Sequence, residues 1–287
     1  MTTDESDLPA GPVEGLSPVS RTALAVARVR AYESARAEPL FTDPYALAFL
    51  AAAGAERPTE GPVGPFARRL VAHGILRTRY YDDRLLAAGT EQVVLLAAGL
   101  DARAHRLEWP DGTRLFELDL PPVLAFKERV LAEHGARARC ARTVVPADLT
   151  DPAWPDLLVD AGFDPDRPTA WLAEGLLVYL ESDQAAELLT AVGRLSAPGS
   201  RLLLEQGRDV TGTPVEEGLT GMTDLWRGGL GPGTGDWLDA HGWTTAFTAL
   251  ADLAAALGRP LPPTVSSAGG SGPVGGTGPG FLEAQRN

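Results

Sequence analysis

An apolar stretch that ends in a turn of small residues constrains this chain more than any other feature. Residues 93–96, Val-Val-Leu-Leu, are followed by Ala-Ala-Gly at 97–99, and the sequence becomes polar at Asp101. A continuous apolar run is typical of a strand in a parallel sheet that is buried on both faces. A turn of small residues after such a strand lets the backbone approach a ligand. We therefore predict a strand that leads through a ligand-binding turn into a helix.

An acidic residue follows this turn at the sequence spacing that is typical of nucleotide-binding folds. A second apolar segment, 114–118, ends at Asp119, which follows Gly99 by about 20 residues. In nucleotide-binding folds an acid at that spacing binds the ribose hydroxyls. The full G-x-G-x-x-G pattern is absent. The sequence therefore favours a ligand with a ribose but without a pyrophosphate.

Apolar segments alternate with helical segments along most of the chain. This alternation is typical of an α/β fold, in which helices cover both faces of a mostly parallel sheet. The predicted strands are 93–97, 114–118, 142–146, 169–173, 200–205, 243–248 and 281–285. The predicted helices are 23–37, 66–88, 102–107, 121–134, 154–161, 182–195, 236–241 and 252–257, with a further helix after Pro44.

Helix starts are predicted from side chains that accept hydrogen bonds from free backbone N–H groups. Ser20 or Thr22 is expected to cap the first helix, and Ser182 the helix at 182–195. Asp43 is expected to cap the second helix, because Pro44 follows it and proline suits the first turn.

Composition and charge exclude several classes of function. The net charge of −13 argues against a nucleic-acid partner and against docking on an anionic membrane. We expect no transmembrane span, because no run of 18 or more apolar residues occurs, and no signal peptide, because residues 1–7 are polar and acidic. The single cysteine fits a reducing cytoplasm, and the four scattered histidines predict no metal site.

Small or acidic residues stand at the ends of four successive predicted strands. In an open parallel sheet the ligand lies beyond the carboxyl ends of the strands. The residues there are Ala97, Ala98, Gly99, Glu117, Asp119, Asp148, Leu149 and Glu174. Any one of these acids alone is more often a helix cap or a turn residue. The ordered set instead favours a cationic ligand that carries a ribose and an amine.

S-adenosylmethionine has this chemistry, because it carries a sulfonium, an α-amine, a ribose diol and an adenine. Asp119 can accept hydrogen bonds from the ribose, and Asp148 from the adenine amine, while Leu149 covers the ring. The carboxylate of the ligand needs a cation, for which Arg30, Arg77 and Arg79 are the candidates.

Several motifs occur together in an order that is typical of a known family. They are Ala-Ala-Gly-Leu-Asp-Ala-Arg at 97–103, Glu-Leu-Asp-Leu-Pro at 117–121, Ala-Asp-Leu-Thr-Asp at 147–151 and Glu-Gly-Leu-Leu-Val-Tyr-Leu at 174–180. Upstream stand Ser-Arg-Thr-Ala at 20–23, Phe-Thr-Asp-Pro-Tyr-Ala at 41–46 and Arg-Thr-Arg-Tyr-Tyr-Asp-Asp at 77–83. Over roughly residues 20–210 the chain resembles the leucine carboxyl methyltransferase family, in its bacterial branch. Together these motifs are specific, whereas no single one is.

The resemblance implies a class I, Rossmann-like methyltransferase with a seven-stranded sheet, a helical N-terminal cap and S-adenosylmethionine as cofactor. It implies that Arg77 holds the methionine carboxylate with help from Arg30. Glu174 is then expected at the amino group or at the substrate end of the cleft. Residues 97 and 99 would meet the methionine moiety, and Ala97 stands where the family usually has glycine. Its methyl group is therefore expected to narrow the turn toward the cofactor.

The same resemblance divides the chain into four parts. We expect a flexible tail at 1–19, a helical cap at 20–88 and a cofactor-binding core at 89–209. Residues 210–287 would form a cap insert and the end of the sheet, with a Gly-rich loop at 266–280. Trp226, Met222, Leu225 and Trp237 are candidates to line the substrate pocket, or they pack a small cap.

The expected reaction is transfer of the methyl group to an oxygen of a small molecule. Family analogy favours the carboxylate of a polyketide-type secondary metabolite, which is already ionised at neutral pH and requires no base. A phenol would require one, and His105 or Tyr179 would then be the candidate. A nicotinamide-dependent oxidoreductase and a degenerate ligand-binding protein remain as alternatives, and both a monomer and a homo-oligomer stay open.

Overall fold

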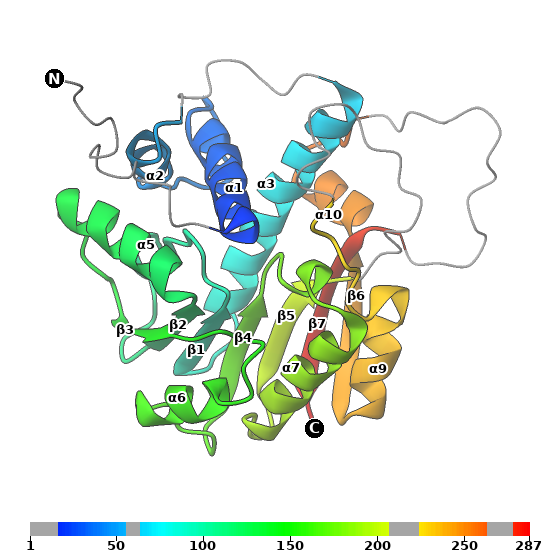
Figure 1. Cartoon of the computed structure of the whole chain (residues 1–287). Coiled ribbons are helices and arrows are strands. Elements are labelled where there is room, and N and C mark those ends of the chain that lie inside the picture. Colours follow the sequence, from blue (N-terminus) through cyan, green and yellow to red (C-terminus); the bar gives the residue numbers. More distant parts are fainter. Residues whose placement is uncertain (1–16, 56–63, 207–223, 263–277) are drawn as a thin grey trace, which may run out of the picture.

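The computed structural model describes residues 17–55, 64–206, 224–262 and 278–287. They include seven strands, which are β1 (Gln92–Leu96), β2 (Arg114–Asp119), β3 (Ala141–Pro146), β4 (Thr169–Ala173), β5 (Arg201–Glu205), β6 (Trp243–Ala249) and β7 (Gly280–Arg286). The strands form one sheet in the order β3-β2-β1-β4-β5-β7-β6 (Figure 1). Strands β1 to β5 pair in parallel, whereas β7 runs antiparallel to both β5 and β6. The predicted mostly parallel seven-stranded sheet is confirmed.

Alternate residues of the central strand β1 face two different hydrophobic cores. Val94 and Leu96 belong to one cluster of buried side chains, while Val93 and Leu95 belong to another. All four side chains are almost completely buried. Side chains alternate between the faces of a strand, so both faces of the sheet are covered. Burial on both faces explains why residues 93–96 form a continuous apolar run in the sequence.

The helices are α1 (Pro18–Ser34), α2 (Ala46–Ala52), α3 (Pro65–Leu86), α4 (Arg103–Arg106), α5 (Pro121–Glu133), α6 (Trp154–Asp160), α7 (Ser182–Arg194), α9 (Thr234–Ala240) and α10 (Leu250–Ala256). Two short 3₁₀ helices, η2 (Leu177–Tyr179) and η3 (Gly231–Gly233), follow β4 and precede α9. Figure 1 shows α1 above the carboxyl ends of the parallel strands, beside α3. None of the helices in these ranges is long and apolar enough to span a bilayer.

Helix starts were predicted less accurately than strands. Helix α1 begins at residue 18, inside the segment predicted as a tail, because the Oγ of Ser17 accepts the backbone N–H of Ser20 at 3.0 Å. The expected caps Ser20 and Thr22 are therefore wrong. Helix α7 begins after Glu181, whose backbone N–H donates to Gln184 Oε1 at 3.0 Å, so Ser182 is not its cap.

Tyr45 rather than Asp43 is the N-cap residue of α2, but the carboxylate of Asp43 still binds the start of the helix. Its Oδ1 atom accepts the backbone N–H groups of Tyr45 and Ala46 at 3.0 and 3.1 Å. These are the free N–H groups at the start of α2, which a carboxylate both satisfies and stabilises through the helix dipole.

The turn after β1 begins one residue earlier than predicted. Ala97 has a φ of +51°, so it leaves the strand and enters the left-handed region, and Gly99 follows with a φ of +52°. Ala97 is the one non-glycine residue with positive φ in the described part of the chain. The N–H of Ala98 donates to the carbonyl of Leu118 at 2.9 Å, which ties the turn to the end of β2.

Glycine at position 97 should stabilise this turn. Left-handed backbone costs an L-residue about 1–2 kcal/mol, and the greater freedom of glycine in the unfolded chain offsets part of that gain. We expect Ala97→Gly to raise the free energy of unfolding by about 0.5–1 kcal/mol in urea titrations. Ala98→Gly is the matched control and should lower it by a similar amount. An Ala97→Gly variant as destabilised as the control would show that the turn is not strained.

Candidate functional site

A cavity of about 1040 Å³ opens at the carboxyl ends of the parallel strands. It is lined by residues at or just beyond the ends of β1 to β5, among them Gly99, Asp119, Asp148, Glu174 and Glu205, and by residues of α1 and α3. Ligand pockets in proteins are on the order of 300–1,000 Å³. The cavity therefore has room for a nucleoside-containing ligand and for a second small molecule.

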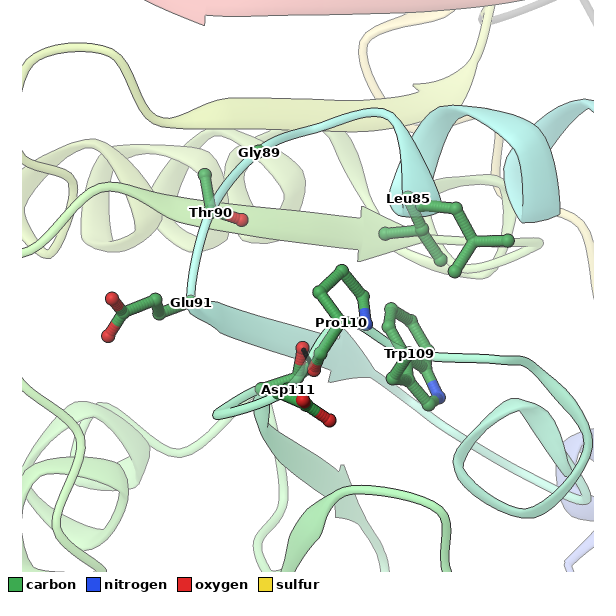
Figure 2. Close-up of a pocket in the computed structure, with 9 residues that line it drawn as sticks. Leu85, Gly89, Thr90, Glu91, Trp109, Pro110 and Asp111 are labelled. Carbon is green, nitrogen blue, oxygen red and sulfur yellow. Dashed lines mark hydrogen bonds between the residues drawn. The ribbon is translucent and has the colours of Figure 1, made fainter.

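A second, smaller pocket lies at the opposite end of the strands, near the amino ends of β1 and β2 (Figure 2). Trp109, Pro110 and Asp111 face Leu85 and Gly89 there, and the volume is only about 140 Å³. None of the predicted site residues lines it. The larger cavity is therefore the candidate site.

Asp119 is fixed against the turn that follows β1. Its Oδ2 atom accepts the N–H of Gly99 at 2.6 Å, and its Oδ1 atom accepts the N–H of Leu120 at 2.7 Å. Burial raises the pKa of Asp119 despite these two hydrogen bonds, which lower it. A Cβ on Gly99 would lie 3.3 Å from the Cβ of Ala23, in a left-handed conformation. Turn and carboxylate therefore form one unit.

Asp148 and Leu149 line the same cavity beyond β3. Asp148 is exposed, and its Oδ1 atom accepts the N–H and the hydroxyl of Thr150 at 2.9 and 2.7 Å. Leu149 is half-buried and packs against the core beneath it. This end of the cavity therefore combines an apolar surface with a fixed carboxylate.

Buried ion pairs position Glu174 at the end of β4. Its Oε2 atom lies 2.7 Å from Nη1 of Arg103, and its Oε1 atom lies 2.9 Å from Nε of Arg77. Arg103 is completely buried, and it also pairs with Asp101 and with Asp82 of α3. Burial alone raises the pKa of Glu174, but the two guanidinium groups outweigh it and lower the pKa to about 2. Glu174 is therefore ionised over the whole physiological range.

Arg77 connects two strand ends rather than one. Its Nη1 atom lies 2.7 Å from Oε1 of Glu205, which is the last residue of β5. Both carboxylate oxygens of Glu205 also accept the N–H of Gly175, at 3.1 and 2.9 Å. Sequence reasoning missed Glu205, although it ends a predicted strand as Glu174 does. Its position at the end of a predicted strand was the signal in the sequence that could have identified it.

Arg30 lines the cavity from α1, as the resemblance implied. Its Nη2 atom donates to the carbonyl of Leu100 at 2.9 Å, and its Nε atom lies 3.5 Å from Oδ2 of Asp43. Arg79 does not line the cavity, since it bonds the carbonyl of Leu40 and pairs with Asp83 on the surface. Of the candidate cations, Arg30 and Arg77 therefore reach the site.

Only some of the residues predicted as a catalytic base or as substrate contacts line the cavity. Tyr179 and Trp226 line the cavity, whereas His105, Leu225 and Trp237 do not. Met222 lies outside the described residues, as do positions 266–277 of the predicted Gly-rich loop. His105 is buried on α4, edge-on to the ring of Tyr45, so the structure removes it as the candidate base.

His73 is a cavity residue that the sequence analysis did not single out. It lies on α3, four residues before Arg77, and its ring stacks on Phe281 at the start of β7 with 5.6 Å between centroids. Leu70 and Gly74 line the cavity from the same helix. Residues three or four apart share a helix face, so the spacing from Arg77 could have found His73.

Removal of the Glu174 charge should change how stability depends on pH. A carboxylate with a folded pKa of about 2 and an ordinary value of 4.5 stabilises the protein above pH 4.5, and this contribution disappears as the pH falls toward 2. We expect Glu174→Gln to lose about 3 kcal/mol of unfolding free energy at neutral pH, with the deficit shrinking between about pH 4.5 and 2. The control Glu187→Gln, an exposed residue of α7, should follow the wild type throughout. A pH-independent deficit would contradict the ionic account.

Comparisons with known proteins agree with this geometry. A sequence profile described as leucine carboxyl methyltransferase matches residues 23–193. A relative from Parafrankia sp. (strain EAN1pec), 50% identical over 272 residues and covering 90% of this chain and 87% of its own, is named "putative S-adenosyl-L-methionine-dependent methyltransferase". A relative from Mycobacterium tuberculosis (strain ATCC 25618 / H37Rv) with the same description is 40% identical over 277 residues, covering 88% and 91%.

A solved structure from Thermobifida fusca YX, described as a "putative methyltransferase", has a TM-score of 0.50 at 18% identity over 90% of this chain and 94% of its own. At that identity the likeness shows the fold alone. Profile, relatives and sheet order agree with the motifs quoted above, including their extent along the chain. The chain therefore belongs to the leucine carboxyl methyltransferase family, and it has the class I methyltransferase fold.

Proposed function

We propose that this protein transfers the methyl group of S-adenosylmethionine to an oxygen of a small, largely apolar molecule. The observation that carries the proposal is the meeting of strand-end carboxylates in one cavity, with Asp119 bonded to the turn at Gly99. A sulfonium and an amine suit an acidic cavity, and a ribose diol suits a fixed carboxylate. S-adenosylmethionine is also the cofactor in the names of the relatives.

The residues of the cavity fit the parts of this cofactor in order along the sheet. Asp119 would accept hydrogen bonds from the ribose hydroxyls, and Asp148 with Leu149 would hold the adenine. Arg77 has 13% of its side chain exposed while Glu174 and Glu205 hold it in place, so it can meet the methionine carboxylate. Glu174 would face the α-amine. The backbone at 97–99 would approach the methionine moiety.

The bound cofactor supplies an electrophilic methyl group with a good leaving group. The chain has to hold the acceptor oxygen in line with that methyl group and exclude water. Alignment of two reactants can supply several kcal/mol of the barrier, on the order of 7–11. A carboxylate acceptor, such as the polyketide-type acid of secondary metabolism that the resemblance favours, would require nothing more. A hydroxyl acceptor would require a base.

A nicotinamide-dependent oxidoreductase fits the site less well. A dinucleotide needs a glycine-rich turn whose N–H groups bind a pyrophosphate. Here the turn holds Ala97 and Ala98, and the N–H of Gly99 is already given to Asp119. A protein that kept the cofactor cavity but lost methyl transfer would still bind S-adenosylhomocysteine, so the acceptor assays below separate that case.

Calorimetric titration with S-adenosylhomocysteine tests the cofactor assignment. We expect micromolar binding by the wild type and no binding of NAD. Asp119→Ala should weaken binding by about 10- to 100-fold, because it removes the acceptor for two ribose hydroxyls. Asp119→Asn, which keeps one acceptor oxygen at the turn, should fold normally and bind with intermediate affinity.

Asp111→Ala is the matched control, since Asp111 is exposed in the turn that precedes the same strand. It should bind S-adenosylhomocysteine as the wild type does. Equal binding by all variants would contradict the role of Asp119. Binding of NAD instead would favour the oxidoreductase.

A further inference from the structure

The cavity extends beyond the part of the sheet that the cofactor would cover. From Asp148 after β3 to Glu174 after β4, the proposed contacts span β3, β2, β1 and β4. The lining continues past β5 to Gln206 and to Gly280, the first residue of β7. From β3 to β7 there are five strand spacings of about 4.8 Å, or roughly 24 Å. The space over β5 and β7 is therefore left for the acceptor.

His73 stands at this second part of the cavity. Its ring stacks on Phe281 of β7, and it lies one helical turn from Arg77, whose guanidinium marks the methionine end. Leu70 lines the cavity three residues before His73 on the same helix, and Pro279 lines it just before β7. An imidazole that lines this part of the cavity can take a proton from an acceptor hydroxyl.

The charges of the lining disfavour an anionic acceptor. The described part of the lining carries five carboxylates, which are Asp101, Asp119, Asp148, Glu174 and Glu205, against two guanidinium groups, those of Arg30 and Arg77. Both guanidinium groups already pair with carboxylates. The buried guanidinium of Arg103 pairs with Asp101 and Glu174 from behind the lining, and the carboxylates stay in excess. The cofactor would add a single net positive charge. A carboxylate acceptor would therefore enter a region that is still negative, at a cost in binding that a neutral molecule avoids.

We propose that the acceptor is a neutral hydroxyl, as on a phenol, of an apolar molecule, and that His73 takes its proton during methyl transfer. This rests on the proposed function. The acceptor oxygen forms a bond to the methyl carbon while the carbon–sulfur bond breaks and leaves its electron pair on sulfur. The hydroxyl proton moves to the imidazole of His73, which returns it to solvent. The products are a methyl ether, S-adenosylhomocysteine and one proton.

Matched naphthalenes test the acceptor class. The protein loaded with S-adenosylhomocysteine is titrated at neutral pH with 2-naphthol and with 2-naphthoic acid, which share the ring system and differ in charge. With S-adenosylmethionine, mass spectrometry separates the methyl ether from the methyl ester. We expect 2-naphthol to bind and to be methylated in preference to 2-naphthoic acid. Preference for the acid, or no binding of either, would overturn the proposal.

Two substitutions test the role of His73. His73→Asn and His73→Gln each keep a hydrogen-bonding group but cannot take a proton. Both should lower kcat for 2-naphthol by about 10²- to 10⁴-fold, and both should remove the rise in rate with pH that the wild type shows. Their binding of S-adenosylhomocysteine and of 2-naphthol should stay at the wild-type level. His241→Asn, which changes an exposed histidine outside the cavity lining, is the control.

A His73 variant that keeps the rate and the pH profile would show that the residue only packs against Phe281. Failure of the cofactor assignment looks different, because the wild type would then not bind S-adenosylhomocysteine at all. The proposal on His73 and the proposal on the cofactor can therefore be contradicted separately.

Discussion

A single buried guanidinium, that of Arg103, determines how the helical cap meets the sheet. It pairs with Asp82 on α3, with Asp101 in the turn after β1 and with Glu174 at the end of β4. Isolated charges inside a protein are costly, so the completely buried Arg103 needs carboxylate partners. Asp82 is shared with Arg106, and Glu174 is shared with Arg77. Three segments far apart in the sequence are therefore held together at the carboxyl ends of the central strands. The candidate site lies on top of this network.

The network also explains the charge of the cavity. Glu174 and Asp101 are kept ionised close together because the guanidinium of Arg103 pairs with both, and it lowers the pKa of each. What remains toward the opening is an acidic surface with an apolar wall from α1 and α3. Such a surface selects a ligand with a cationic centre and excludes free anions. One arrangement thus supports both the cofactor assignment and the preference for a neutral acceptor.

The fold could be predicted from the sequence because its strongest signals are local. Each strand of the sheet was placed within two residues, since buried parallel strands are short apolar runs between turns. The cap of α1 was misplaced because serines at 17 and 20 compete and only packing selects one of them. The one-residue error at Ala97 has another cause, because left-handed backbone is not expected of alanine.

The candidate site was predicted where it follows the strand ends and missed where it depends on packing. Asp119 and Glu174 follow apolar runs directly, and the structure brings them together. His73 and Glu205 were missed because their importance depends on which face of α3 meets β5 and β7, a tertiary fact. His105 looked equally suitable in the sequence, yet it is buried away from the cavity.

The most direct test of this account is a crystal structure of the protein with S-adenosylhomocysteine. The account predicts the ligand across the carboxyl ends of the strands, with its ribose hydroxyls on Asp119, its adenine beside Leu149 and its carboxylate facing Arg77. The space near His73 would then stay open for an acceptor. A ligand bound elsewhere, or a ribose that leaves Asp119 uncontacted, would contradict the central claim that the strand-end carboxylates form a methyltransferase cofactor site.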